Sequence, residues 1–297
     1  MKQILKLVQA SATAALVIFS GQAAAADPIV VGGKNFTEQQ IMAEMTSQLL
    51  KAKGHDVDTR AGMGSAVLRQ AQENGQVDVY WEYTGTALIV YNKVTTPMSA
   101  QDGYAKVKAL DAAKGLVWLN PSKANNTYAL AMRHQEADSL GIHTISDLAN
   151  TLNGGKDLTF AVNAEFYARA DGLKPLQKTY GFEFKRANIK RMDTGLTYQA
   201  LRDKQVDVAL VFATDGRIPA FDFVVLKDNK DYFPSYALTP VIRKAVLDKQ
   251  PKLADTLNSL SAVLDDKTMA HLNAQVDVDH KSISDVCQAF LKEKGLI

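Results

Sequence analysis

The chain has a single cysteine among its 297 residues and lacks the motifs that mark catalytic or metal sites. Cys287 has no partner for an internal disulfide, and we interpret it as a small core residue of a helix near the end of the chain. Neither H-E-x-x-H nor G-x-S-x-G occurs. The five histidines are scattered without metal-ligand spacing: His55, His134, His143, His271 and His280. These absences do not exclude an enzyme, but they leave a hydrolase without a recognisable nucleophile and give no reason to expect a metal or cofactor.

The chain also lacks an excess of positive charge and, after its first 26 residues, any long hydrophobic run. Lys2 and Lys6, the apolar stretch Ala12–Ser20 and the small residues Ala24–Ala26 before Asp27 are typical of a cleaved signal peptide. The apolar stretch is too short for a membrane span, and a retained amphipathic helix fits it less well. Cleavage removes two of the 34 basic residues, so that basic residues equal the 32 acidic ones. Without a basic excess we expect no binding of nucleic acid.

No cysteine follows the signal peptide directly, so a lipid anchor at the new N-terminus is not expected. We therefore expect a soluble protein that is secreted into the periplasm. About 270 residues remain after cleavage, which is enough for two modest domains at roughly 100–200 residues each.

Two segments share a frame in which an apolar strand ends in an aromatic ring. Gln76–Thr86 reads QVDVYWEYTGT and Gln205–Gly216 reads QVDVALVFATDG, and each follows a helix-like segment. Seven residues after the first glutamine of each frame lies an aromatic residue, Tyr83 or Phe212. In open α/β sheets, ligands bind outside the carboxyl ends of the strands. The repeated frame therefore predicts an α/β fold with two similar lobes and one ligand between them.

The chain is expected to pass between the lobes twice. We assign residues 27–131 and 237–297 to lobe 1 and residues 132–236 to lobe 2. The first crossing would lie near Asn125–Met132 and the second at the aromatic turn Tyr232–Tyr236. These two crossings would act as the hinge.

Similar strand–turn–helix units are expected in the two lobes. In the first, Thr37 and Gln40 have the spacing of a capping box at the start of a helix. In the second, the strand Leu158–Val162 leads into a helix in the same way. The pattern further predicts a strand at Phe182–Lys185 and helices throughout Pro240–Ile297.

Four aromatic residues lie at proposed strand ends or crossings: Tyr83, Tyr128, Phe212 and Tyr236. Any one of them alone is more simply explained as a core residue. Four in such places, two of them in matched frames, favour a cage around one ligand. A ring face attracts a cation by ~0.5–2 kcal/mol per contact. Because a quaternary ammonium has no N–H to donate, several ring faces around it are the natural means of recognition.

Short motifs spread over nearly the whole chain after residue 26 strengthen this interpretation. They are Gly33–Gln39 (GKNFTEQ), Glu82–Thr86 (EYTGT), Asn125–Tyr128 (NNTY), Glu165-Phe166 with Arg169 and Asp171-Gly172, Thr214–Gly216 (TDG), and Phe233-Pro234 with Tyr236. In order and spacing they resemble the substrate-binding proteins of osmoprotectant ABC transporters. These are the glycine betaine, choline and carnitine binders of the ProX, OpuBC/OpuCC and OsmF group.

The resemblance implies a type II periplasmic-binding fold that closes over its ligand in the cleft between the lobes. Carried over residue by residue, the cage for the trimethylammonium group would be formed by Tyr83, Tyr128, Phe212 and Tyr236. The ligand carboxylate would be held by Lys34, Thr86 and Arg169, with help from Gln39. One departure is that the position of Phe212 is commonly Tyr, so the ring face is kept and the hydroxyl is lost. Affinity or ligand preference can therefore differ from that of the family.

Each of the polar assignments has a simpler alternative. Lys34 and Arg169 can be surface charges, and Thr86 can be a helix cap. If the assignments hold, Lys34 and Arg169 favour glycine betaine over choline, because choline offers only a hydroxyl.

We expect a monomeric binding protein without catalytic activity or cofactor. It would capture a small-molecule quaternary amine in the periplasm and present it to an inner-membrane ABC permease with its ATPase. Three alternatives remain open: a receptor for another small cation or an amino acid, a sensor component that reports ligand occupancy to a membrane partner, and a secreted enzyme on the same two-lobed plan.

Overall fold

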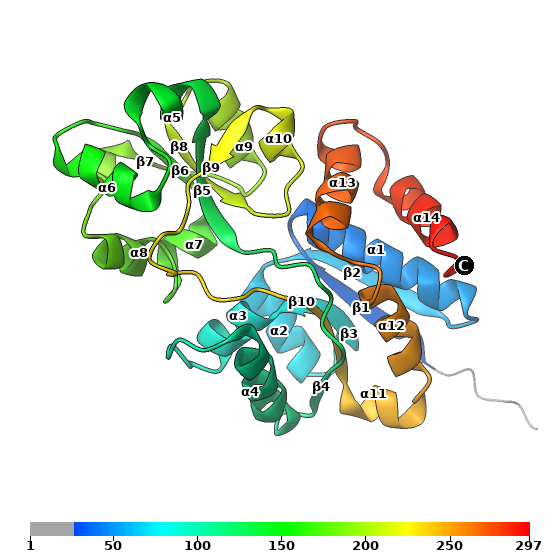
Figure 1. Ribbon diagram of the computed structural model, residues 1–297. Coiled ribbons are helices and arrows are strands. Elements are labelled where there is room, and N and C mark those ends of the chain that lie inside the picture. The colour runs from blue at the N-terminus through cyan, green and yellow to red at the C-terminus, as the bar shows by residue number, and fades with distance from the viewer. Residues whose placement is uncertain (1–26) are drawn as a thin grey trace, which may run out of the picture.

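The computed structural model describes residues 27–297, which form two α/β lobes that are each built on a five-stranded sheet (Figure 1). The expected two-lobed α/β fold is confirmed. The expected signal peptide, residues 1–26, lies outside the described residues. In the part of the chain that the structure describes, no helix has both the length and the apolar character needed to cross a bilayer.

The sheet of lobe 1 has the strand order β2-β1-β3-β10-β4. Its strands are β1 (Ile29–Lys34), β2 (Val57–Met63), β3 (Val79–Tyr83), β4 (Leu116–Trp118) and β10 (Leu238–Arg243). The first three run parallel, and β10 lies antiparallel between β3 and β4. All five residues of β3 are buried, as expected for a strand that helices cover on both faces.

The helices of lobe 1 come from both ends of the chain. The N-terminal part contributes α1 (Thr37–Ala52), α2 (Ser65–Glu73), α3 (Thr84–Thr86), the π-helical turn η1 (Ala87–Tyr91) and α4 (Ala100–Ala112). The C-terminal part contributes α11 (Lys244–Lys249), α12 (Leu253–Ser261), α13 (Asp266–Asp277) and α14 (Ile283–Glu293). Helices α13 and α14 pack on α1, so the two ends of the chain share one lobe (Figure 1).

The sheet of lobe 2 has the strand order β7-β6-β8-β5-β9. Its strands are β5 (Tyr128–Arg133), β6 (Phe160–Val162), β7 (Ile189–Arg191), β8 (Val208–Phe212) and β9 (Phe223–Val225). Its helices are α5 (His134–Leu140), α6 (Ile145–Asn153), α7 (Ala164–Ala168), α8 (Leu173–Tyr180), the 3-10 turn η2 (Arg186–Asn188), α9 (Leu196–Arg202) and α10 (Arg217–Ala220).

Two connecting segments join the lobes and run side by side (Figure 1). Asn125 and Ala237 form an antiparallel bridge, and the Leu238 amide donates to the carbonyl of Ala124 at 2.9 Å. Every residue of β5 from Tyr128 to Arg133 belongs to the second sheet, where the strand pairs with β8 and β9. The expected lobe boundary after residue 131 is therefore corrected to a position before Tyr128.

Three local expectations are wrong. Helix α1 starts without the expected capping box, because Phe36 is the N-cap and the Thr37 hydroxyl instead donates to Asp277 at 2.8 Å. Residues 182–185 form no strand; Phe184 is buried with its ring stacked on Phe160 at 4.8 Å between centroids. Residues 240–297 are not helical throughout, because β10 precedes the four C-terminal helices.

The two matched frames form equivalent units, as predicted. Strand β3 follows α2 and ends at Tyr83, and β8 follows α9 and ends at Phe212. Both strands are almost wholly buried, which fixes the position of the aromatic side chain at each carboxyl end. The two rings thus lie at the edges of the two sheets that face the space between the lobes.

Candidate functional site

A small cavity of about 30 Å³ lies between the lobes, well below the ~300–1,000 Å³ typical of small-molecule sites, because the lining side chains nearly fill the space. All of the predicted site residues line it except Gln39: Tyr83, Tyr128, Phe212, Tyr236, Lys34, Thr86 and Arg169. Seven further residues complete the lining: Asn35, Phe36, Ser65, Asn126, Asn163, Glu165 and Thr194. We call this space the interlobe pocket.

The aromatic rings of the interlobe pocket contact one another in a series that extends from one lobe to the other. Tyr128 begins β5 directly opposite Phe212, the last residue of β8, and their ring centroids are 5.2 Å apart. Tyr236, on the second connecting segment, meets Tyr128 edge-on at 5.7 Å. Phe36 stacks on Phe212 at 5.0 Å and on Tyr83 at 6.3 Å. Several ring faces and edges therefore surround a single space, the arrangement that suits a quaternary ammonium.

Phe36 was not predicted as part of the cage. It is the residue before α1, and the motif Gly33–Gln39 contains it, but spacing along the sequence gives no indication that its ring reaches Phe212 in the other lobe. It supplies the contact that joins the rings of the two matched frames.

Replacing Phe36 with Ala is expected to weaken the binding of a quaternary amine by about tenfold, because one ring contact of ~0.5–2 kcal/mol is lost. The matched control is Phe221→Ala, since Phe221 is also half-buried but packs on Phe223 away from the pocket. Fluorescence titration of both variants measures the effect. Equal affinities in the two variants would exclude Phe36 from the cage.

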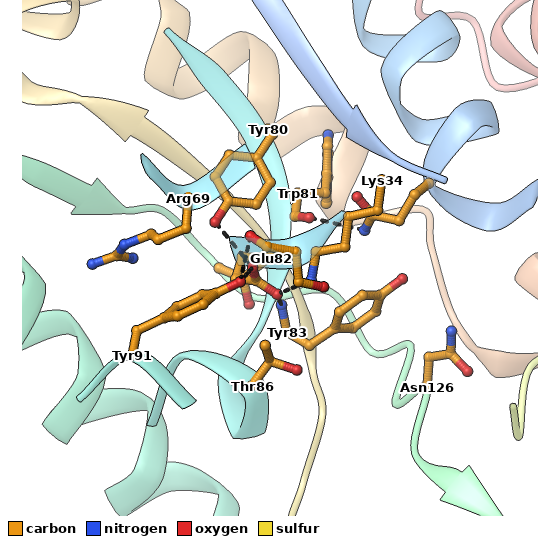
Figure 2. A network of polar contacts seen from close by, with 12 residues as sticks. Lys34, Arg69, Tyr80, Trp81, Glu82, Tyr83, Thr86, Tyr91 and Asn126 are labelled. Atoms are coloured by element: carbon orange, nitrogen blue, oxygen red, sulfur yellow. Dashed lines mark hydrogen bonds and ion pairs between the residues drawn. The ribbon is translucent and has the colours of Figure 1, made fainter. Parts of the chain in front are cut away.

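Lys34 is buried, so the alternative of a surface charge is wrong for this residue. Its Nζ lies 2.5 Å from Glu82 Oε1 and 4.9 Å from the centre of the Tyr83 ring. Figure 2 shows the Glu82 carboxylate at the centre of this network, where it also accepts from the Tyr80 and Tyr91 hydroxyls at 2.9 and 3.2 Å. An ammonium has three N–H groups, so Lys34 keeps donors for a ligand after it has paired with Glu82.

Arg169 is also buried, and Asp171 holds its guanidinium in a bidentate pair with distances of 2.7 and 2.6 Å. Another nitrogen of the group donates to Glu165 at 3.0 Å and to the Thr86 hydroxyl at 3.3 Å. Because Thr86 belongs to lobe 1 and Arg169 to lobe 2, this contact spans the pocket. The guanidinium also lies 5.1 Å from the centre of the Tyr128 ring.

Tyr236 is held in place from two sides. Its hydroxyl donates to Asp171, the carboxylate that also pairs with Arg169. Burial, and then the charge of Asp171, raise the pKa of Tyr236 well above its ordinary value, so the hydroxyl remains a donor. On the other side lies Gly85, where an added Cβ would come within 2.8 Å of the Tyr236 ring. The glycine of the Glu82–Thr86 motif thus permits the close approach of this ring.

Glu38, which was not predicted as a site residue, connects the two matched frames behind the rings. Its carboxyl group is buried and accepts from the Tyr83 hydroxyl at 2.8 Å and from Thr214, two residues after Phe212. Asn126 donates to it at 2.8 Å from the first connecting segment. Burial raises the pKa of Glu38 above its ordinary value, and these hydrogen bonds oppose that effect.

Gln39 lies behind the pocket rather than in its lining. Its Nε2 donates to the carbonyl of Trp81 at 2.8 Å, which ties α1 to β3. The structure therefore places Gln39 where it supports the strand that carries Tyr83. Across residues 27–297, no group of three or more His, Cys, Asp or Glu side chains is positioned to hold a metal ion.

Two α/β lobes, two antiparallel connecting segments and a pocket lined by residues of both lobes define a two-lobed substrate-binding protein. The chain belongs to the family of substrate binding domains of ABC-type glycine betaine transport systems, whose model matches residues 27–293. Members of this family bind small ligands for transport and are not enzymes; they work with a permease and its ATPase and typically lie outside the cytoplasmic membrane.

Individual relatives agree with this assignment. The chain is 44% identical over 298 residues to the glycine-betaine-binding protein of Pseudomonas aeruginosa, covering 98% of this chain and 96% of that protein. It is 34% identical over 280 residues to the glycine betaine-binding protein YehZ of Escherichia coli, with coverage of 91% and 92%. A solved glycine betaine/carnitine/choline ABC transporter structure matches with a TM-score of 0.74 and 29% identity, covering 90% of this chain and 99% of that one.

Proposed function

We propose that this protein captures a quaternary-ammonium osmolyte, with glycine betaine the favoured ligand, and delivers it to an inner-membrane ABC permease with its ATPase. The observation that carries the proposal is the set of aromatic rings from both lobes around one pocket. Tyr83, Tyr128, Phe212 and Tyr236 would form the cage, and Phe36 would add a further wall. The family and two of its members described above are named for glycine betaine, which favours this ligand for the present chain as well.

In this proposal the ligand carboxylate lies toward the polar side of the interlobe pocket. Lys34 and Arg169 retain N–H groups beyond those used by Glu82 and Asp171, because an ammonium has three donors and a guanidinium five. The Thr86 hydroxyl already accepts from Arg169 and would donate its own hydrogen to the ligand. Gln39 would act indirectly, through the strand that positions Tyr83.

Closure of the lobes would accompany binding. The contact between Arg169 and Thr86, that between Thr214 and Glu38, and the ion pair of Arg217 with Asp277 at 3.3 Å each join lobe 2 to lobe 1. A ligand that touches rings of both lobes favours the closed arrangement in which these contacts form. We further propose that the mature protein is a periplasmic monomer that needs no cofactor and carries out no reaction.

Calorimetric titration of the refolded, ligand-free mature protein tests the proposal. The panel is glycine betaine, choline, carnitine, proline betaine and an uncharged amino acid. We expect heat from one or more quaternary amines, no heat from the amino acid, and recovery of every bound ligand unchanged. Binding of the amino acid alone would indicate the alternative receptor function, and formation of a product from the ligand would indicate an enzyme.

A further inference from the structure

The charges of the side chains in and directly behind the lining of the interlobe pocket do not sum to zero. Lys34 and Arg169 are positive, and Glu165 is negative. Immediately behind the lining, Glu82 pairs with Lys34 at 2.5 Å, and Asp171 forms the bidentate pair with Arg169. Each cation therefore already has a carboxylate of its own, and the charge of Glu165 is left in excess.

Glu165 lies where it can act on a ligand. It belongs to the short helix α7 of lobe 2, and 35% of its side chain is exposed while its neighbours Asn163 and Arg169 are buried. One carboxylate oxygen accepts from Arg169 at 3.0 Å, and the other accepts from the Ser65 hydroxyl at 3.0 Å. Ser65 is the first residue of α2 in lobe 1, so this hydrogen bond joins the two lobes beside the pocket.

We propose that Glu165 is a specificity-determining residue, which sets the preference of the pocket between quaternary amines with a net positive charge and zwitterions that carry a carboxylate. This inference rests on the proposed function. Because Glu165 shares Arg169 with Asp171, one negative charge remains in excess, and it attracts any ligand cation but repels a ligand carboxylate that lies near Lys34, Thr86 and Arg169. It therefore favours choline-like ligands relative to glycine betaine and limits the affinity for the latter.

The bond between Ser65 and Glu165 allows the charge to be separated from lobe closure. Ser65→Ala removes this one of the hydrogen bonds between the lobes and leaves the carboxylate in place, so it weakens the binding of both kinds of ligand by a similar factor. Glu165→Gln keeps an oxygen that can accept from Ser65 and removes the charge. Only Glu165→Gln weakens the binding of a cation while it strengthens the binding of a carboxylate.

The experiment is calorimetric titration of wild type, Glu165→Gln, Glu165→Asp and Ser65→Ala with choline and with glycine betaine at low ionic strength. We expect Glu165→Gln to raise the ratio of betaine affinity to choline affinity about tenfold, the order expected for a nearby charge at an effective dielectric constant of about 20. Glu165→Asp and Ser65→Ala are expected to leave this ratio within about twofold of wild type, because both keep the charge.

An unchanged ratio in Glu165→Gln, or a shift of the same size in Ser65→Ala, would overturn this inference and leave the proposed function intact. Absence of binding by every quaternary amine in the wild type would instead overturn the proposed function itself. Circular dichroism of each variant confirms that folded proteins are being compared.

Discussion

Replacing Tyr236 with Ala is expected to lower the affinity for glycine betaine by about 30-fold or more, corresponding to ~2 kcal/mol for a desolvated ring contact. Tyr236 is buried, it meets Tyr128 edge-on, and its hydroxyl is bound to the carboxylate that positions Arg169. Truncation therefore removes one wall of the cage and loosens the polar side of the pocket. Calorimetric titration of the variant measures the loss.

Two control variants separate recognition from folding. Tyr236→Phe keeps the ring and is expected to retain most of the affinity. Tyr180→Ala removes another buried tyrosine of the same kind, whose hydroxyl also donates to an aspartate, but which does not line the interlobe pocket. It is expected to lower stability without changing the affinity of the folded protein. Unchanged betaine binding in Tyr236→Ala would remove Tyr236 from the cage.

Replacing Glu82 with Gln is expected to lower the free energy of unfolding by about 3–5 kcal/mol, because the buried ammonium of Lys34 loses its counter-charge. Glu82 is fully buried, and its carboxylate lies 2.5 Å from the Lys34 ammonium. Urea unfolding followed by circular dichroism measures the loss. The double variant with Lys34→Met is expected to recover part of it, since neither side chain of the former pair then carries a charge.

The control for this second prediction is the exposed pair of Lys244 and Asp248. Their side chains are 62% and 60% exposed, although the distance between them is only 2.6 Å. Asp248→Asn is expected to cost less than about 1 kcal/mol, because water already screens the pair. A similar cost for Glu82→Gln would show that burial adds nothing to the pair of Lys34 and Glu82.

The parts of the site that the sequence could predict are those fixed by local strand geometry. A buried apolar strand that ends in an aromatic residue places that ring at the edge of its sheet, and the repeated frame indicated two such edges. Tyr83 and Phe212 do lie at the carboxyl ends of β3 and β8 and line one pocket. The two-lobed fold could also be predicted from local patterns, because strands and helices alternate along most of the chain and the frame occurs twice.

Contacts between segments far apart in the chain could not be predicted in this way. Phe36 stacks on a residue of the other lobe, and Glu38 accepts from both Tyr83 and Thr214. The pairing of Lys34 with Glu82 joins neighbouring strands, and nothing in either local pattern specifies it. These contacts depend on how two lobes and two connecting segments are arranged in space.

The incorrect secondary-structure predictions have similar causes. The prediction of helices throughout Pro240–Ile297 missed β10, which lies between β3 and β4 because the returning chain completes the sheet of lobe 1. The alternating pattern of Phe182–Lys185 resembles a strand, but its rings are buried in the core without strand pairing. The short edge strand β7 was not predicted. Its first residue is half-buried and its other two are exposed, so its sequence lacks the apolar pattern of a buried strand.

We propose that the interlobe pocket recognises a quaternary ammonium through the positive charge of this group. The most direct measurement compares glycine betaine with its neutral-headed isostere, in which a tert-butyl group replaces trimethylammonium and the carboxylate is kept. Both ligands have nearly the same shape and apolar surface, but only betaine can be attracted electrostatically by the ring faces. By calorimetry we predict that betaine binds at least tenfold more tightly. Equal affinity for the two ligands would contradict the claim, because shape and hydrophobic burial alone would then account for binding.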